Sequence, residues 1–173
     1  MAFVLVRIDD RLIHGQVTVA WGTWLEPDRI ILANDEVAGT PWKRELYSET
    51  DTLGAAITVV SVQGFAEGVA DGRWDAERVF VIVESPGDLL ALIRGGLVVP
   101  VANVGGMHAS RGKREVLPFV HVDDADVAAM REIVAAGTRL EARDVPQGDS
   151  RDLGSLLHLL PDTPGASTGS PST

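Results

Sequence analysis

Residues 79–93 read VFVIVESPGDLLALI, and this stretch decides the fold class. Its first five residues, 79–83, are apolar on both faces, which is typical of a central strand in a parallel sheet. Ser85 and Asp88 then have the spacing of a capping box, and leucines follow at helical intervals. The stretch therefore predicts a buried strand that runs directly into a helix packed on the sheet.

The same pattern recurs on both sides of this stretch. Runs rich in β-branched residues, expected to form strands, are 3–8, 29–32, 57–62, 98–104, 116–122 and 140–145. Helices are expected in the segments that begin near Ile13, Thr40-Pro41, Phe65, Asp123 and Leu153. The last of these is expected to extend to Leu160. Pro118 lies inside one run and suggests an edge or irregular strand there. Strands alternating with helices predict one α/β domain with a mostly parallel sheet and helices on both faces.

Composition and charge exclude several classes of protein. The 173 residues include 15 Lys+Arg, 25 Asp+Glu and no cysteine, which gives a net charge of −10. The absence of cysteine excludes disulfides, Fe–S clusters and thiolate zinc sites. Negative charge disfavours binding to nucleic acid and to anionic lipid, and no apolar run approaches the length of a membrane span.

The N-terminal six residues lead into charged residues and do not resemble a signal peptide. We therefore expect a soluble, cytoplasmic protein with no nucleic-acid partner and no direct insertion into a membrane. Residues 1–160 are expected to form the domain. Residues 161–173 are rich in Pro, Gly, Ser and Thr, and we expect them to be a disordered tail.

Charged side chains and one imidazole gather where the first strand meets the first helix. The segment from residue 7 to residue 17 reads RIDDRLIHGQV. In open parallel sheets, ligands bind beyond the carboxyl ends of the strands. A neutral His14 could attack phosphorus through a ring lone pair, while Arg11 and Arg7 could bind phosphoryl oxygens. Asp9 or Asp10 could fix the imidazole tautomer or hold an arginine. A solvated or capping histidine beside an acidic turn is the simpler alternative.

The segment RIDDRLIHGQV closely resembles the active-site signature of the IIB component of the mannose/fructose/sorbose family of the sugar phosphotransferase system. Further matches follow in order at Trp21, Arg29-Ile30, residues 34–38 (NDEVA), residues 103–108 (NVGGMH) and residues 122–146. The resemblance implies a three-layer α/β domain with a twisted, largely parallel sheet of seven strands. It departs from the family's pattern at residues 39–42 (GTPW), where a charged stretch is more usual.

The resemblance also implies the chemistry. His14 matches the histidine that accepts a phosphoryl group, on Nδ1, from a phosphohistidine of the IIA component. The group then passes to a sugar imported through the IIC and IID membrane components. Arg11 and Arg7 match arginines that steady the phosphate, and Asp9 and Asp10 match the accompanying carboxylates. Gly15 and Gln16, the next residues of the motif, are expected to support phosphate binding, without a metal or another cofactor.

Other features carry weaker hypotheses. Gly105, Gly106 and His108 end a predicted strand on the same rim as His14. The glycines could admit a phosphate or a partner, or could form a tight turn with positive φ. His121 with Asp123 and Asp124 could be drawn as a metal site, but the acids are better explained as helix-starting residues.

Four tryptophans and a histidine complete the candidates. We expect Trp21 and Trp24 on the buried face of the first helix, Trp42 and Trp74 in polar surroundings where they could aid docking, and His158 on the exposed face of the last helix.

The sequence thus predicts a phosphoryl carrier centred on His14, with IIA, the permease components and a sugar as partners. Two alternatives stay open. One is a regulatory relative that signals sugar supply, and the other is a non-enzymatic module that binds a small anion.

Overall fold

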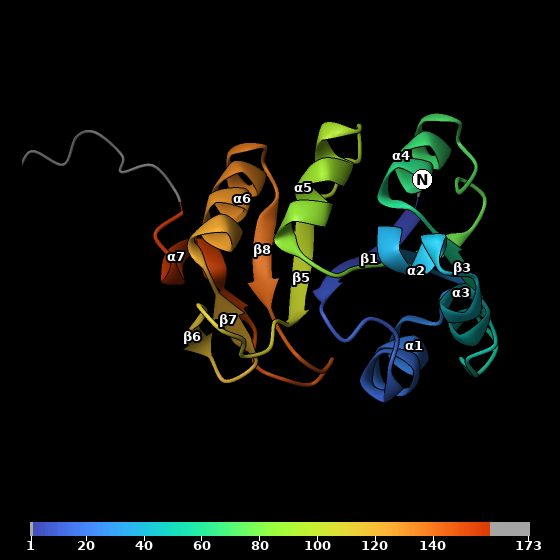
Figure 1. Ribbon diagram of the computed structural model, residues 1–173, viewed down its shortest axis with the longest axis horizontal. Coiled ribbons are helices and arrows are strands. Elements are labelled where there is room, and N and C mark those ends of the chain that lie inside the picture. Colours follow the sequence, from blue (N-terminus) through green and yellow to red (C-terminus); the bar gives the residue numbers. More distant parts are fainter. Residues whose placement is uncertain (1, 160–173) are drawn as a thin grey trace, which may run out of the picture.

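The computed structural model describes residues 2–159 and shows a seven-stranded sheet with the strand order β3-β2-β4-β1-β5-β8-β9 (Figure 1). All neighbouring strands are parallel except β8 and β9. The strands are β1 (Ala2–Asp9), β2 (Arg29–Ala33), β3 (Ala56–Val60), β4 (Arg78–Val83), β5 (Val101–Gly106), β8 (Arg139–Ala142) and β9 (Arg151–Asp152). This confirms the predicted fold class.

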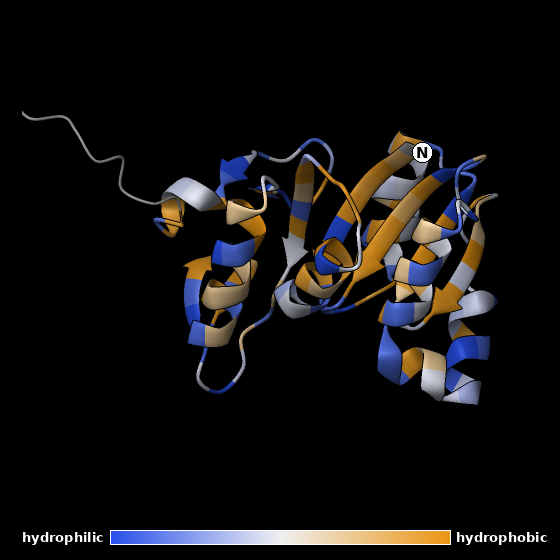
Figure 2. Ribbon diagram, turned by 90° about the horizontal axis from the view of Figure 1, so that it is seen from above, coloured by the Kyte–Doolittle hydropathy of each residue, from blue (hydrophilic) through white to orange (hydrophobic). Residues whose placement is uncertain are grey.

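Helices cover both faces of the sheet. One face carries a continuous helix that starts as the π-helical η1 (Gln16–Trp21) and continues as α1 (Gly22–Leu25), together with α2 (Asp35–Gly39) and α3 (Pro41–Ser48). The other face carries α4 (Val62–Ala70), α5 (Pro86–Arg94), α6 (Asp124–Ala135) and the short α7 (Leu153–Leu156). Figure 2 shows central strands coloured mainly as hydrophobic, between helices that mix hydrophobic and hydrophilic residues.

Strand β4 contributes side chains to two hydrophobic cores, one on each face of the sheet. Val79, Val81 and Val83 pack into the core beneath α4, α5 and α6. Phe80 and Ile82 point the other way, toward η1 and α1. Successive side chains of a strand face opposite sides of the sheet, so a strand buried on both faces needs the unbroken apolar run seen in the sequence.

Helix starts follow the predicted capping residues. Ser85 accepts a hydrogen bond from the backbone N–H of Asp88 and begins α5. Asp123 and Asp126 form a reciprocal capping box at the start of α6. Thr40 precedes Pro41 at the start of α3, as predicted, although the Thr40 side chain makes no capping bond.

The structure corrects two predicted strands and adds one. The run 116–122 is not a strand of the main sheet but a hairpin, β6 (Arg114–Leu117) and β7 (Val120–Val122), with Pro118 in its turn. Strand β5 starts at Val101 rather than at residue 98, and it includes Gly105 and Gly106. The two-residue β9 completes the sheet and was not predicted.

The C-terminal helix is also shorter than predicted, since α7 ends at Leu156. His158 is exposed, as expected, but it lies beyond α7 with a positive φ of 50°. Leu160 and the predicted tail at 161–173 lie outside the described residues. Among residues 2–159, no helix has the length and apolar character needed to cross a bilayer.

Candidate functional site

Strand alternation gathers the polar residues of β1 and β5 under helix η1. In β1, Val6 and Ile8 belong to the core beneath α5 and α6, so Arg7 and Asp9 face the opposite side, toward η1. The parallel register pairs Arg7 with Asn103 of β5. A basic, an acidic and an amide side chain therefore meet at the carboxyl ends of two adjacent strands.

Arg7 is completely buried, and all five of its N–H groups are used. Its Nε and Nη2 donate to Oδ2 of Asp9 at 3.2 and 2.8 Å, and its Nη1 donates to Oδ1 of Asn103 at 2.6 Å. The backbone carbonyls of Arg143 and Asp144 accept the remaining two bonds. Arg7 therefore has no donor left for a phosphate, which corrects the expectation that it binds phosphoryl oxygens directly. Its role is to hold Asp9.

Two neighbours shape the space around the Arg7 guanidinium. The ring of Trp21 lies 5.2 Å from it, in a cation–π arrangement, and the indole N–H donates to the carbonyl of Asp144 at 2.8 Å. On the other side is Gly105, where an added Cβ would lie 1.7 Å from Cζ of Arg7. Gly105 has no positive φ. Gly105 therefore does not form the predicted tight turn with positive φ, and its lack of a side chain makes room for the Arg7 guanidinium.

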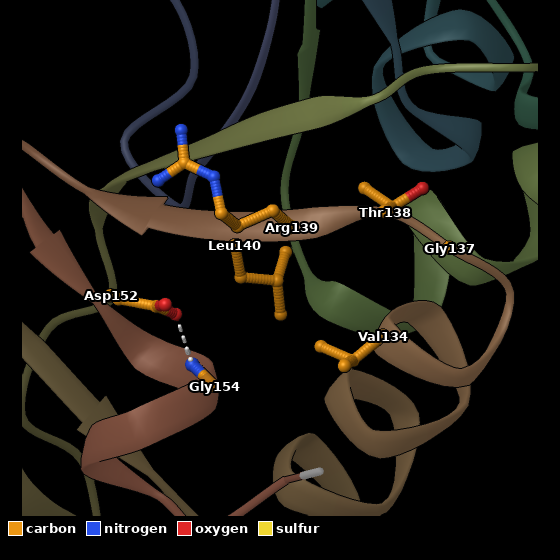
Figure 3. Close-up of a pocket in the computed structure, with 7 residues that line it drawn as sticks. All are labelled: Val134, Gly137, Thr138, Arg139, Leu140, Asp152 and Gly154. Carbon is orange, nitrogen blue, oxygen red and sulfur yellow. Dashed lines mark hydrogen bonds between the residues drawn. The ribbon is translucent and has the colours of Figure 1, made fainter.

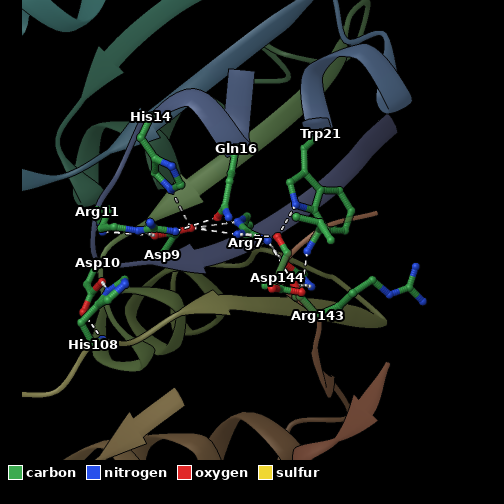
Figure 4. A network of polar contacts seen from close by, with 12 residues as sticks. Arg7, Asp9, Asp10, Arg11, His14, Gln16, Trp21, His108, Arg143 and Asp144 are labelled. Atoms are coloured by element: carbon green, nitrogen blue, oxygen red, sulfur yellow. Dashed lines mark hydrogen bonds and ion pairs between the residues drawn. The ribbon is translucent and has the colours of Figure 1, made fainter. Parts of the chain in front are cut away.

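Asp9 joins this buried arginine to His14. Oδ2 of Asp9, which accepts from Arg7, also contacts Nε2 of His14 at 3.1 Å (Figure 4). Oδ1 of Asp9 accepts from the backbone N–H of Arg11 at 3.1 Å. Burial favours a raised pKa for Asp9, but the hydrogen bond from His14 and the charge of Arg7 outweigh it and hold the pKa below its ordinary value.

An ionised Asp9 determines which nitrogen of His14 carries the proton. A carboxylate only accepts hydrogen bonds, so the neutral ring must carry its hydrogen on Nε2. Within residues 2–159, Nδ1 of His14 makes no hydrogen bond, and the side chain is 19% exposed. The ring therefore offers a lone pair on Nδ1 in a fixed orientation, which is what a nucleophile requires.

Arg11 lies beside the same Asp9 carboxylate as His14. It lies in the loop before the helix, is 43% exposed, and donates from Nη2 to Oε1 of Gln16 at 2.7 Å. The helix starts later than predicted, so Arg11 and His14 do not share a helical face. They are brought together by their common contact with Asp9 instead. The backbone N–H groups of Gly15 and Gln16, in the first turn, make no hydrogen bond within the described residues. Unpaired N–H groups at the start of a helix favour an anion beside them.

Asp10 makes a separate connection across the sheet edge. Its carboxylate accepts from the backbone N–H of His108 at 2.6 Å and contacts the ring Nδ1 of the same residue at 2.5 Å. An added Cβ on Gly106 would lie 2.9 Å from Oδ1 of Asp9 and 3.3 Å from Cε1 of His108. Gly106 therefore permits the close packing of the loop on β5. Asp10 therefore holds the loop against His108, while Asp9 holds the His14 ring.

Asn103, Trp21 and the carbonyls of Arg143 and Asp144 complete the support for Arg7. From the sequence, Asn103 was assigned no role and Trp21 was assigned only to packing. A polar residue inside an apolar run, as Asn103 is in VANV, is the signal that could have identified it. The two backbone carbonyls could not be predicted from the sequence, because every residue has a carbonyl group.

The remaining predicted candidates lie outside this network. Nδ1 of His121 contacts the carbonyl of Met107, and Asp123 caps α6, which confirms the helix-starting role of that acid. Among residues 2–159, no cluster of three His, Asp or Glu side chains could hold a metal ion.

The structure corrects the expectations for Trp24 and Trp74. Trp24 is 56% exposed rather than buried, and it touches Trp21 edge-on. Trp74 is buried against Phe65 and is not available for docking. Trp42 is exposed, as expected.

A cavity of about 230 Å³ opens at the amino end of β8, next to β9 (Figure 3). Its lining is largely apolar, and its one acid, Asp152, already accepts a hydrogen bond from the backbone N–H of Gly154. His14 lies at the carboxyl ends of the strands, so this cavity is not part of the site.

The chain is similar to known proteins along most of its length. Residues 3–162 match the family model described as the PTS system sorbose subfamily IIB component. The N-acetylgalactosamine-specific phosphotransferase enzyme IIB component 2 of Escherichia coli K12 is 35% identical over 154 residues, covering 89% of this chain and 98% of that protein. The sorbose-specific EIIB component of Klebsiella pneumoniae is 35% identical over 150 residues, covering 87% and 92%.

A solved structure agrees along nearly the whole chain. The IIBSor domain of the sorbose permease from Klebsiella pneumoniae has a TM-score of 0.86 and 32% identity, covering 94% of this chain and 100% of that domain. The chain therefore belongs to the sorbose subfamily of IIB components of the sugar phosphotransferase system.

Proposed function

We propose that this IIB component carries a phosphoryl group on Nδ1 of His14. The observation that carries the proposal is the hydrogen bond between Nε2 of His14 and the buried carboxylate of Asp9, which is itself fixed by Arg7. Nε2 is thereby occupied, while Nδ1 is left with its lone pair at the partly exposed edge of the ring.

The donor is a phosphohistidine of a IIA protein. The Nδ1 lone pair of His14 attacks phosphorus, the P–N bond of the donor breaks, and its electron pair returns to the donor ring. Asp9 keeps the Nε2 proton in place and stabilises the positive character that the ring gains. The mannose-specific EIIAB component of Escherichia coli K12, 37% identical over 145 residues, supports a link between IIA and IIB, because its name places both in one protein.

Arg11 supplies the charge that the transferred group needs. Phosphoryl transfer depends mainly on positioning and on neutralising charge over the phosphoryl oxygens. Arg11 can turn its free Nη1 toward a phosphoryl group on His14, and the N–H groups of Gly15 and Gln16 add donors from the helix start.

In the second step, a sugar hydroxyl attacks phosphorus and the P–Nδ1 bond breaks, while the hydroxyl proton passes to a base or to water. His14 is then again neutral with its proton on Nε2. We assign this step to a sugar being imported through the IIC and IID components. The chain would then work in the cytoplasm, held beside the membrane by these components.

Labelling from a phosphorylated IIA protein tests this proposal. We expect the wild-type chain to gain an acid-labile, base-stable phosphate and His14→Ala to gain none. Equal labelling of both chains would remove His14 as the carrier. No labelling of either chain by a competent donor would favour the anion-binding alternative.

A further inference from the structure

Helix α3 presents two large apolar side chains to solvent. Trp42 is 63% exposed and Leu46 is 59% exposed. They are four residues apart, so they lie on the same face of the helix. None of the residues of α3 is fully buried. Large apolar side chains grouped on a surface in this way are typical of an interaction site.

Beside these two residues lies a cavity of about 140 Å³, enclosed by the start of α2, by α3 and by the loop that carries His14. Leu12, Val37 and Tyr47 contribute apolar lining. The size of the cavity suits one aliphatic or aromatic side chain better than an extended ligand.

The charged and amide side chains that line the cavity are paired with one another. Asn34 is buried, donates to Oε2 of Glu84 at 2.7 Å, and accepts from the backbone N–H of Val37 at 2.9 Å. At the rim, Lys43 is paired with Glu36. These pairings leave few groups to bind a polar ligand, so the surface favours an apolar side chain inserted by a protein partner.

The cavity lies at the same sheet edge as His14. Asn34 follows β2, Glu84 follows β4 and Leu12 follows β1, and these strands are adjacent in the order β2-β4-β1. A protein that brings a phosphohistidine within bonding distance of His14 must cover the loop containing Leu12. The surface around Trp42 is therefore continuous with a contact that phosphoryl transfer requires.

We propose that Trp42, Leu46 and the cavity beside Leu12 form the apolar anchor for the IIA donor, which inserts an apolar side chain from the surface around its own phosphohistidine. This inference rests on the proposed function. The anchor includes the exposed side chain of Trp42, so its shape also determines which IIA protein this chain accepts.

Donor kinetics test the anchor. Replacing Trp42 and Leu46 together by Ala should raise the KM for phosphorylated IIA by about tenfold or more, as expected for an interface hot spot, and leave kcat within about twofold. The matched control is Val98→Ala, which removes an 84% exposed side chain just before β5, at the opposite edge of the sheet. It should behave like wild type. Leu46→Gln, which keeps the length of the side chain, should give a smaller rise in KM and guards against misfolding of the double variant.

Direct binding separates this proposal from the carrier assignment. In the His14→Ala chain, unphosphorylated IIA should shift the amide NMR signals of α3 and of Leu12, and Trp42→Ala should weaken the binding. An unchanged KM for the double variant, or shifts confined to other elements, would overturn the anchor and leave the carrier role intact. Binding at α3 without any labelling of His14 would instead support the anchor and overturn the proposed carrier role.

Discussion

Asp9→Asn tests the network that orients His14. The Asp9 carboxylate accepts two hydrogen bonds from Arg7, one from the His14 ring and one from the backbone N–H of Arg11. An asparagine has one oxygen and one NH2 group. If its oxygen faces Arg7 and His14, its NH2 group faces the N–H of Arg11, and two donors meet.

The expected loss of stability follows from these contacts. The substitution leaves the buried Arg7 charge with only neutral acceptors, and removing one partner of a buried ion pair costs about 3–5 kcal/mol. A domain stability of about 5–15 kcal/mol allows the variant to remain folded. With a urea m-value of about 2 kcal/mol/M, the unfolding midpoint should fall by about 2 M.

The same variant should lose phosphoryl transfer. Without the carboxylate, the His14 ring is no longer held with its proton on Nε2, so we expect transfer from IIA to slow by about a hundredfold. Urea unfolding and donor kinetics are measured beside Asp124→Asn, a control at a fully exposed carboxylate. If Asp9→Asn unfolds and accepts phosphate like this control, the reasoning about the buried network is refuted.

Three further predictions concern residues of the same site. Arg11→Ala should slow transfer by about tenfold or more while changing the unfolding free energy by less than about 0.5 kcal/mol, because its side chain is partly exposed; an unchanged rate would end its role as phosphate ligand. Gly105→Ala should destabilise the chain by about 3 kcal/mol or more, because the added Cβ would overlap the Arg7 guanidinium. Gly39→Ala is the control, because the space around Gly39 is open and the substitution should not destabilise the chain. Thermal unfolding of both variants checks the difference. The pKa of Asp9 is lower in the folded chain than in the unfolded one, so its contribution to stability is present above about pH 4 and is lost as pH falls through the folded pKa. Unfolding free energies measured from pH 6 downward should therefore fall less steeply in Asp9→Asn than in wild type, and parallel curves would contradict this.

Most of the sheet could be predicted because its strands are strongly apolar or lie beside clear capping residues. Val79–Val83 with Ser85 is the strongest case, and the structure places both as expected. The predicted strand 116–122 failed because a β-branched run does not reveal whether a proline bends it into a hairpin. Strand β9 was not predicted at all, because two residues carry too little pattern to indicate a strand.

At the candidate site, the sequence predicted that residues 7–16 act together, but it did not show which side chains contact one another, and it missed Asn103. His14 and Asp9 are five residues apart, and nothing in that spacing shows which of Asp9 and Asp10 reaches the ring. Strand alternation turns Asp9 toward η1 and leaves Asp10 to meet His108. Arg7 could not be recognised as buried from its charge, because its burial depends on partners in β5 and in the loop after β8.

The position of the phosphate on the imidazole ring tests the central claim most directly. The chain is labelled with 15N-histidine and phosphorylated by IIA at alkaline pH, and NMR then identifies the ring nitrogen coupled to phosphorus. We expect a single phosphohistidine, at His14, with phosphorus on Nδ1 and the proton retained on Nε2. Phosphorus on Nε2 of His14, or on any other residue, would contradict this claim.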